Sequence, residues 1–383
     1  MNNIVSSSAF ADSRQHYALL DGLRGVAAML VVLYHVFEGF AFAGQTDIVF
    51  INHGYLSVDF FFILSGFVIS YAYDSRWATS LSMKGFARRR LIRLHPMVIL
   101  GAVVGAVTFC IQGSEQWDGT HVATSMVMLA LLCAMFFVPA IPGCCYEVRG
   151  NGELFPLNGP SWSLFFEYIG NIIYAIVLRR LSNAVLAVVV VVIGLAWAAF
   201  AVFDFSGYGM IGVGWTFDLP NMLGGTLRML FPFTLGMLVQ RNFKPWKVRG
   251  AFWIAAALLA PVMFVPIIPQ TIAGSIHLNG LFELACVAVL FPIVVRIGAS
   301  GVTTDHTSSL VCKFLGDISF PLYIVHYPFM YLFYSWLIKN QVYDFAGSWP
   351  LAIGVYVWNV LFAYLCLKFY DEPLRRWLSR RFK

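Results

Sequence analysis

Long apolar runs decide what this chain can fold into. About 20 consecutive apolar residues cross a bilayer as a helix, and 60% of the 383 residues are hydrophobic while 11% are charged. The candidate spans are 17–40, 55–74, 96–112, 122–141, 161–179, 183–203, 221–240, 250–268, 277–297, 314–337 and 349–369. Backbone polar groups inside lipid must pair within their own segment. We therefore predict an all-α fold: a polytopic integral membrane helical bundle.

The remaining segments are too short to form a soluble domain. We expect a cytoplasmic N-terminal tail over 1–16, one membrane-embedded domain over 17–370 and a basic cytoplasmic tail over 371–383. No cleaved signal peptide is predicted, because the start is polar and the first apolar run is too long. The 7 Cys and 8 His show no disulfide or zinc spacing, so no metal site is predicted. The basic residues cluster at span ends, which argues against a nucleic acid partner.

Lys and Arg gather in some linkers and are missing from others. Linkers with an excess of Lys and Arg face the cytoplasm. This rule places the linkers 75–95, 179–182 and 240–250, together with the C-terminal tail, on the cytoplasmic side. We expect both termini to be cytoplasmic.

Two cytoplasmic termini require an even number of crossings. Three candidate runs lie between Arg93 and Arg179, both expected inside, and three crossings cannot return the chain to the same side. One of 96–112 and 122–141 is therefore expected to be re-entrant or interfacial, leaving about ten transmembrane helices. We slightly favour 96–112 as that segment, since it is shorter and opens with Pro96.

Arg24 and His35 lie eleven positions apart in the first apolar run. Eleven residues at 100° each return to the same helix face, with a rise of about 16 Å. Arg24 is thus expected near the cytoplasmic surface and His35 deeper in the membrane. Ionisable groups at such depth are costly, so they indicate a functional site. A neutral imidazole can act as a general base on a hydroxyl.

Three further ionisable residues are expected at a depth similar to that of His35. They are Asp59, Glu167 and His326, each on a different predicted helix. A carboxylate beside an imidazole orients it and stabilises its charged form. We expect Glu167 or Asp59 to orient His35, and Arg24 or His35 to pair with Asp59. A purely structural charge pair for Asp59 stays open.

The basic cluster before Pro96 contains Arg88, Arg89, Arg90 and Arg93. Guanidinium groups bind phosphates with two parallel hydrogen bonds. The cluster either binds a phosphate-bearing ligand or anchors the chain to anionic membrane lipids. The arginines of the C-terminal tail are interpreted as an anchor.

Five segments in order make the chain resemble the acyltransferase 3 family of integral membrane O-acyltransferases that act on carbohydrates. The matching segments are Leu20-Asp21-Gly22-Leu23-Arg24-Gly25 followed by His35, Val58-Asp59-Phe60-Phe61-Phe62-Ile63-Leu64-Ser65-Gly66-Phe67, Arg90-Leu91-Ile92-Arg93, Trp162-Ser163-Leu164-Phe165-Phe166-Glu167, and Leu315-Gly316-Asp317-Ile318-Ser319-Phe320-Pro321-Leu322-Tyr323-Ile324-Val325-His326. Each match is weak alone, but five at plausible intervals are specific.

The resemblance implies transfer of an acyl group, often acetyl, from cytoplasmic acyl-CoA to a carbohydrate hydroxyl. It implies that His35 and Arg24 are the essential pair and that Arg90 and Arg93 bind the donor. We place Arg89 with these donor-binding arginines. Some members carry a fused extracytoplasmic hydrolase-like domain, which this chain is expected to lack.

We hypothesise that acetyl-CoA binds the arginines at 88–93 and delivers its thioester to His35. His35 then acts as general base or carries the acyl group itself, and both routes stay open. The acceptor is expected to be a cell-surface or exported carbohydrate or a glycolipid. We expect Trp162, Ser163 and His326 to bind substrate. The rival hypotheses are a glycan or glycolipid transporter or flippase, and a non-catalytic subunit of an export complex.

Overall fold

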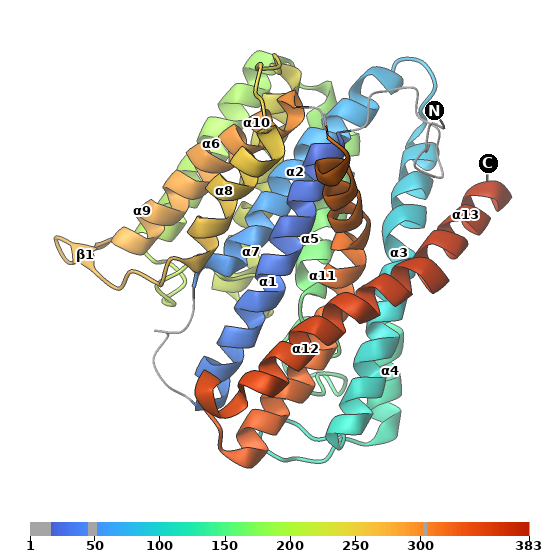
Figure 1. Cartoon of the computed structure of the whole chain (residues 1–383), viewed down its shortest axis with the longest axis vertical. Helices are drawn as coiled ribbons and strands as arrows, with labels where there is room; N and C mark the ends of the chain where they lie inside the picture. The colour runs from blue at the N-terminus through green and yellow to red at the C-terminus, as the bar shows by residue number, and fades with distance from the viewer. Residues whose placement is uncertain (1–16, 45–51, 302–304, 383) are drawn as a thin grey trace.

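The computed structural model describes residues 17–44, 52–301 and 305–382. The predicted tail over 1–16 lies outside these residues. The helices are α1 (Ala18–Gly44), α2 (Ser57–Tyr73), α3 (Met83–Gln112), α4 (Thr124–Met135), α5 (Ser161–Ile176), α6 (Asn183–Val202), α7 (Leu219–Arg241), α8 (Ala251–Phe264), α9 (Leu278–Ala285), α10 (Phe291–Ser300), α11 (His306–Asn340), α12 (Phe345–Cys366) and α13 (Glu372–Arg381). The strands β1 (Thr271–Ile272) and β2 (Ile276–His277) form a two-stranded antiparallel hairpin. The predicted all-α membrane bundle is confirmed (Figure 1).

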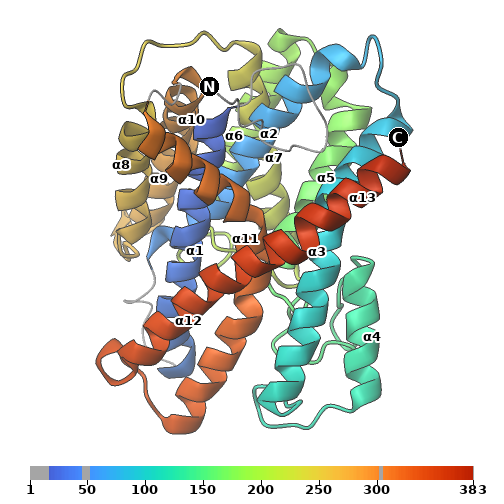
Figure 2. The same ribbon diagram turned by 45° about the vertical axis from the view of Figure 1, so that its right-hand side comes forward.

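In the part of the chain that the structure describes, nine helical segments are long and apolar enough to cross a membrane. Two of them join consecutive helices through a π-helical turn, at Cys286–Leu290 between α9 and α10 and at Leu367–Asp371 between α12 and α13. The second junction produces one long oblique helix (Figure 2). The predicted run 250–268 is reduced to α8, whose 14 residues rise only about 21 Å.

Of the two runs 96–112 and 122–141, the second is the one too short to cross the membrane, whereas we favoured the first. Residues 96–112 are the second half of α3, a helix of 30 residues. Its Pro96 is accommodated within the helix, as is common in membrane helices. The run 122–141 forms only α4, whose 12 residues rise about 18 Å, short of the roughly 30 Å hydrocarbon core. α4 lies along one half of α3 (Figures 1 and 2).

The basic linkers lie at one end of the bundle. The linker from α7 to α8 and the linker from α2 to α3 are both at the upper end in Figures 1 and 2. α1 starts at this end, and α13 ends near it. We call it the basic end. It is the end that the distribution of Lys and Arg predicts to be cytoplasmic.

Glycines bring α1 into contact with α11 along its length. A Cβ added at Gly25 would lie 2.3 Å from the Leu315 carbonyl oxygen, and one at Gly39 would lie 2.5 Å from the ring of Tyr334. Small residues let membrane helices approach closely, which increases their van der Waals contact. The helix that carries Arg24 and His35 is therefore fixed against α11.

We expect Gly25→Ala to destabilise the protein by about 1–3 kcal/mol, because the added methyl group meets backbone that cannot rotate away. Gly354→Ala is the matched control: it also lies in a helix, α12, but no atom lies within 4 Å of an added Cβ. There alanine should be neutral or stabilising by up to about 1 kcal/mol. Thermal unfolding in detergent compares the two. Equal melting temperatures would show that the contact between α1 and α11 tolerates a side chain.

Candidate functional site

His35 forms a hydrogen bond with Glu38, one turn later on α1. The His35 Nδ1 and Glu38 Oε2 atoms are 2.5 Å apart, and the two side chains are 14% and 25% exposed. Glu38 also accepts hydrogen bonds from the hydroxyls of Tyr34 (3.0 Å) and Tyr334 (3.1 Å). A carboxylate held in this way fixes the orientation of the ring and turns its Nε2 away from Glu38.

Glu38 is the site residue that sequence reasoning missed. The spacing of three puts His35 and Glu38 on one helix face, so His-x-x-Glu was a readable signal. The predicted orienting carboxylates lie on other helices instead. Glu167 bonds to Arg90 and Ser65, and Asp59 bonds to Arg228, so the expectation that one of them orients the ring is wrong in this structure.

His326 on α11 stacks against His35. The ring centroids are 5.3 Å apart at an interplanar angle of 29°. Nδ1 of His326 bonds to the carbonyl oxygens of Leu322 (3.1 Å) and Tyr323 (2.9 Å). Because carbonyls only accept, Nδ1 carries the proton and Nε2 is left as an acceptor. This Nε2 is buried and has no hydrogen-bond partner among the described residues. The similar depth expected for the two histidines is confirmed by their contact.

Tyrosines connect the histidine pair to the loop between α4 and α5. The ring of Tyr327 lies edge-on to the ring of His35, with the centroids 4.7 Å apart. It also lies edge-on to the ring of Tyr331, at 4.6 Å. Tyr331 donates a hydrogen bond to Glu153 and lies 3.6 Å from the Arg149 guanidinium. Burial raises the pKa of Glu153 to about 7. The outer part of the site therefore changes its charge near neutral pH.

Arg24 lies at the basic end, about three turns from His35. It pairs with Asp21 (3.0 Å) on α1 and donates to the hydroxyl of Ser319 (2.9 Å) on α11. The predicted pairing of Arg24 with Asp59 is therefore wrong. Ala28 and Val31 lie between Arg24 and His35 on the same face and are at most 1% exposed, so packed side chains fill the space between the two residues.

The arginines of α3 point in different directions. Arg90 is buried and forms a 2.6 Å ion pair with Glu167 on α5, which also accepts a hydrogen bond from Ser65 (3.0 Å) on α2. Arg93 is exposed and lies within electrostatic range of Arg24. Arg89 is partly exposed and lies near Arg76. The structure thus brings Arg90, Arg93 and Glu167 together with Arg24 and leaves Arg89 to one side.

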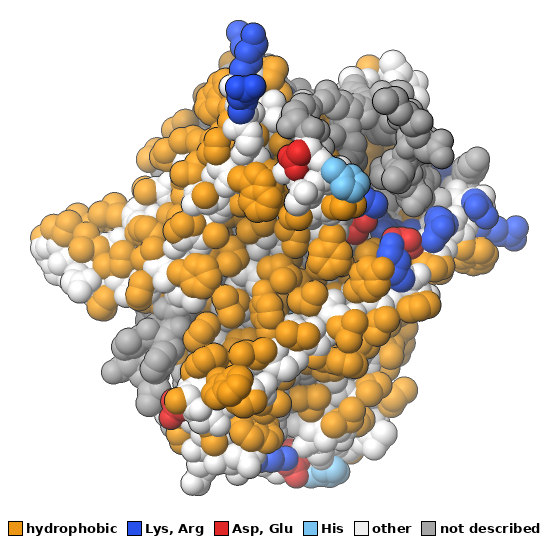
Figure 3. Space-filling model, in the orientation of Figure 1, with side chains coloured by type: hydrophobic (Ala, Val, Ile, Leu, Met, Phe, Trp, Pro, Cys, Tyr) orange, Lys and Arg blue, Asp and Glu red, His pale blue; other side chains and the backbone are white. Residues whose placement is uncertain are grey.

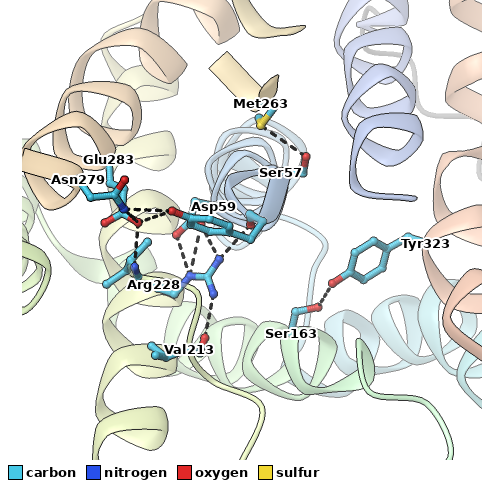
Figure 4. Close-up of polar contacts among 11 residues, drawn as sticks. Ser57, Asp59, Ser163, Val213, Arg228, Met263, Asn279, Glu283 and Tyr323 are labelled. Atoms are coloured by element: carbon cyan, nitrogen blue, oxygen red, sulfur yellow. Dashed lines mark hydrogen bonds and ion pairs between the residues drawn. The ribbon is translucent and has the colours of Figure 1, made fainter. Parts of the chain in front are cut away.

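Asp59 belongs to a second buried network, shown in Figure 4. Arg228 on α7 bonds to its carboxylate at 2.7 Å and to the carbonyl oxygens of Tyr55 and Val213. The hydroxyl of Tyr55 in turn donates to Glu283 at 2.6 Å. Asp59 and Arg228 are at most 1% exposed. The sequence could not predict this pair, since the partner lies on a helix outside the matched segments.

Trp162 and Ser163 begin α5 and contact different clusters. Trp162 lies 5.1 Å from the Arg228 guanidinium, in the Asp59 network. Ser163 and Tyr323 are joined by a 2.7 Å hydrogen bond between their hydroxyls (Figure 4). The ring of Tyr323 is 5.9 Å from that of His326. Ser163 therefore reaches the histidine pair through one tyrosine.

We expect Asp59→Asn to destabilise the protein by about 3–5 kcal/mol, because it leaves Arg228 buried without a counter-ion. Asp317→Asn is the control, since its ion pair with Lys313 is 40–50% exposed and contributes at most about 1 kcal/mol. Chemical denaturation in detergent micelles measures both. If Asp59→Asn changes the free energy of unfolding as little as Asp317→Asn does, the pair of Asp59 with Arg228 does not stabilise the fold.

Comparison with known proteins gives one consistent result. The acyltransferase domain profile of the acyltransferase 3 family matches residues 17–368. Acyltransferase MdmB of Streptomyces mycarofaciens is 25% identical, over 94% of this chain and 92% of its own length. No solved structure matches the chain.

Two other relatives align over different extents. A putative O-acetyltransferase of Staphylococcus aureus (strain COL) is 22% identical over 93% of this chain, which spans only 57% of that protein. Protein 2 in the picA locus of Rhizobium radiobacter is 34% identical over 42% of this chain and 82% of its own length.

Proposed function

This chain belongs to the acyltransferase 3 family and is a multi-pass membrane O-acyltransferase, and we propose that it moves an acyl group, in the simplest case acetyl, from cytoplasmic acyl-CoA to a carbohydrate or glycolipid hydroxyl. The bacterial inner membrane is the proposed location. The observation that carries the proposal is the hydrogen bond between His35 and Glu38, with His326 stacked on His35. Arg24, at the basic end, lies on the same face of α1 as His35.

The reaction needs a base for the acceptor hydroxyl. In the proposed step, Nε2 of His35 takes the hydroxyl proton while the oxygen attacks the thioester carbonyl. The bond from carbon to sulfur then breaks, and the thiolate takes the proton from His35. Glu38 stabilises the imidazolium that exists between these steps, because it bonds to Nδ1.

The donor side of the proposal rests on the arginines of the basic end. Arg24, Arg90 and Arg93 gather there, and guanidinium groups suit the phosphates of a nucleotide. The pantetheine arm has to reach His35, about 16 Å along α1 from Arg24. Since Ala28 and Val31 are buried between them, side chains packed on this face of α1 have to move when the donor binds, while the backbones of α1 and α11 stay in contact.

The acceptor side is proposed to face the tyrosines between His35 and the loop of Glu153. Aromatic rings combine an apolar face with a polar edge, which suits a sugar. Tyr327, Ser163 and the free Nε2 of His326 offer hydrogen bonds for its hydroxyls. The alternative route, in which His35 first carries the acyl group as an N-acyl intermediate, uses the same residues.

We expect His35→Ala to abolish acylation while the protein still inserts, since general-base catalysis contributes about 10²–10⁴-fold. The test is mass spectrometry of surface glycans from a deletion strain complemented with wild type, His35→Ala or His306→Ala. The last variant changes an exposed histidine and should restore the ester, whose mass identifies the acyl group. Full acylation by His35→Ala would end the proposal.

We expect Glu38→Gln to lower kcat roughly tenfold with little change in the donor KM. Glutamine keeps the shape but replaces a charge-assisted hydrogen bond with a neutral one, a difference of about 1–1.5 kcal/mol. Steady-state kinetics with membranes that contain the acceptor would measure both constants. Glu115→Gln, in the loop between α3 and α4, should match wild type. An unchanged kcat for Glu38→Gln would show that His35 needs no carboxylate partner.

A further inference from the structure

Helix α13 crosses beside α3 at the basic end (Figure 2). It continues α12 through the π-helical turn Leu367–Asp371, a distortion that often occurs at functional sites. Tyr370 in this turn donates a hydrogen bond to the Pro96 carbonyl oxygen of α3 at 3.1 Å. The start of α13 is thereby tied to the helix that carries the Arg-x-x-Arg segment.

Arg375 of α13 faces this junction. Its guanidinium forms a 2.5 Å ion pair with Asp371, which is 1% exposed, while the Arg375 side chain is 33% exposed. Arg93 is within electrostatic range of Asp371, and both Arg93 and Arg375 are within range of Arg24. Three arginines from three helices, α1, α3 and α13, therefore converge at one place.

The positive charge at this place exceeds what the neighbouring carboxylates neutralise. Arg24 pairs with Asp21 and Arg375 pairs with Asp371. Arg93 lies within electrostatic range of Asp371 but forms no close ion pair with a described carboxylate. Figure 3 shows basic and acidic side chains gathered on the right, where α13 meets α3, on a surface that is otherwise largely apolar. Like charges held together repel unless an anion joins them.

Two buried polar atoms of the junction also lack a partner among the described residues. They are Oδ1 of Asp371 and Nε of Arg375. Buried polar groups are normally hydrogen bonded, so these atoms are available to a ligand that brings both donors and acceptors. A nucleotide with phosphate oxygens and amino groups has both.

We propose that Arg375 is a donor-binding residue, which forms with Arg93 a phosphate site for the nucleotide end of acyl-CoA at the junction of α13 with α3. This inference rests on the proposed function and assigns α13 to the donor site instead of to membrane anchoring. Asp371 orients the guanidinium of Arg375. Arg376 instead pairs with Glu372, and Arg380 and Arg381 lie at the far end of α13.

The experiment compares binding of CoA with binding of pantetheine, which has the same arm but no phosphate. Isothermal titration calorimetry uses the full chain in detergent micelles as wild type, Arg375→Ala, Arg375→Lys and Arg380→Ala. Arg380 is exposed on the same helix and serves as the matched control. Arg375→Lys keeps the charge that pairs with Asp371 but loses the two-pronged geometry.

Arg375→Ala should weaken CoA binding about tenfold or more and leave pantetheine binding unchanged. Arg375→Lys should recover part of the loss, and Arg380→Ala should match wild type on both ligands. Equal CoA affinity of Arg375→Ala and Arg380→Ala would overturn the inference. So would an equal loss for CoA and pantetheine, because the effect would then not act through phosphate.

Failure of the proposed function gives a different result. If wild type does not bind CoA, the donor assigned in that proposal is wrong, and the role of Arg375 is overturned with it. If wild type binds CoA and Arg375→Ala binds it equally well, only the inference about α13 fails.

Discussion

The close packing of α1 against α11 is the contact on which the site depends. With glycine at positions 25 and 39, the two helices approach until backbone and ring atoms touch. The same contact places His35 against His326, and it brings Arg24 within reach of Ser319. Any shift between the helices would therefore disturb the base and the donor end together, although they are about 16 Å apart. Rigid support of this kind is what a catalytic constellation requires.

Buried charges elsewhere in the bundle have partners that keep them away from the histidines. Arg228 binds Asp59 with three contacts of 2.7 to 3.3 Å, and Arg90 binds Glu167. A buried carboxylate without a counter-ion is costly in a medium of low dielectric constant. These pairs leave Glu38, which is held by tyrosine hydroxyls instead of a cation, as the carboxylate available to His35. A cation on Glu38 would weaken its ability to stabilise an imidazolium.

The sequence predicted the similar depth of His35 and His326 correctly, but it misplaced Glu167, which lies with Arg90 and Arg24 at the basic end, and it predicted partners on different helices poorly. Hydrophobic length correctly gave a helical membrane bundle, because it depends on the segment itself. The residues that face one another on different helices depend on rotation and packing, which no single segment specifies. Arg228 was missed as the partner of Asp59 for this reason. Glu38 was within reach of sequence reasoning, since His35 lies on the same helix. The prediction of which run crosses the membrane, the one in α3 or the one in α4, failed because it depended on where each helix ends. Helix ends are the least reliable feature of a sequence pattern.

The continuous helix from Phe345 to Arg381 connects the lipid-facing surface to the charged end of the bundle. Its 37 residues amount to about 55 Å, more than the thickness of a hydrocarbon core. A helix of this length extends beyond the core, and its contacts with α11 and α3 set its tilt. A change in either contact would move Arg375 relative to Arg93, so the lipid-facing half of this helix is mechanically coupled to the charged end.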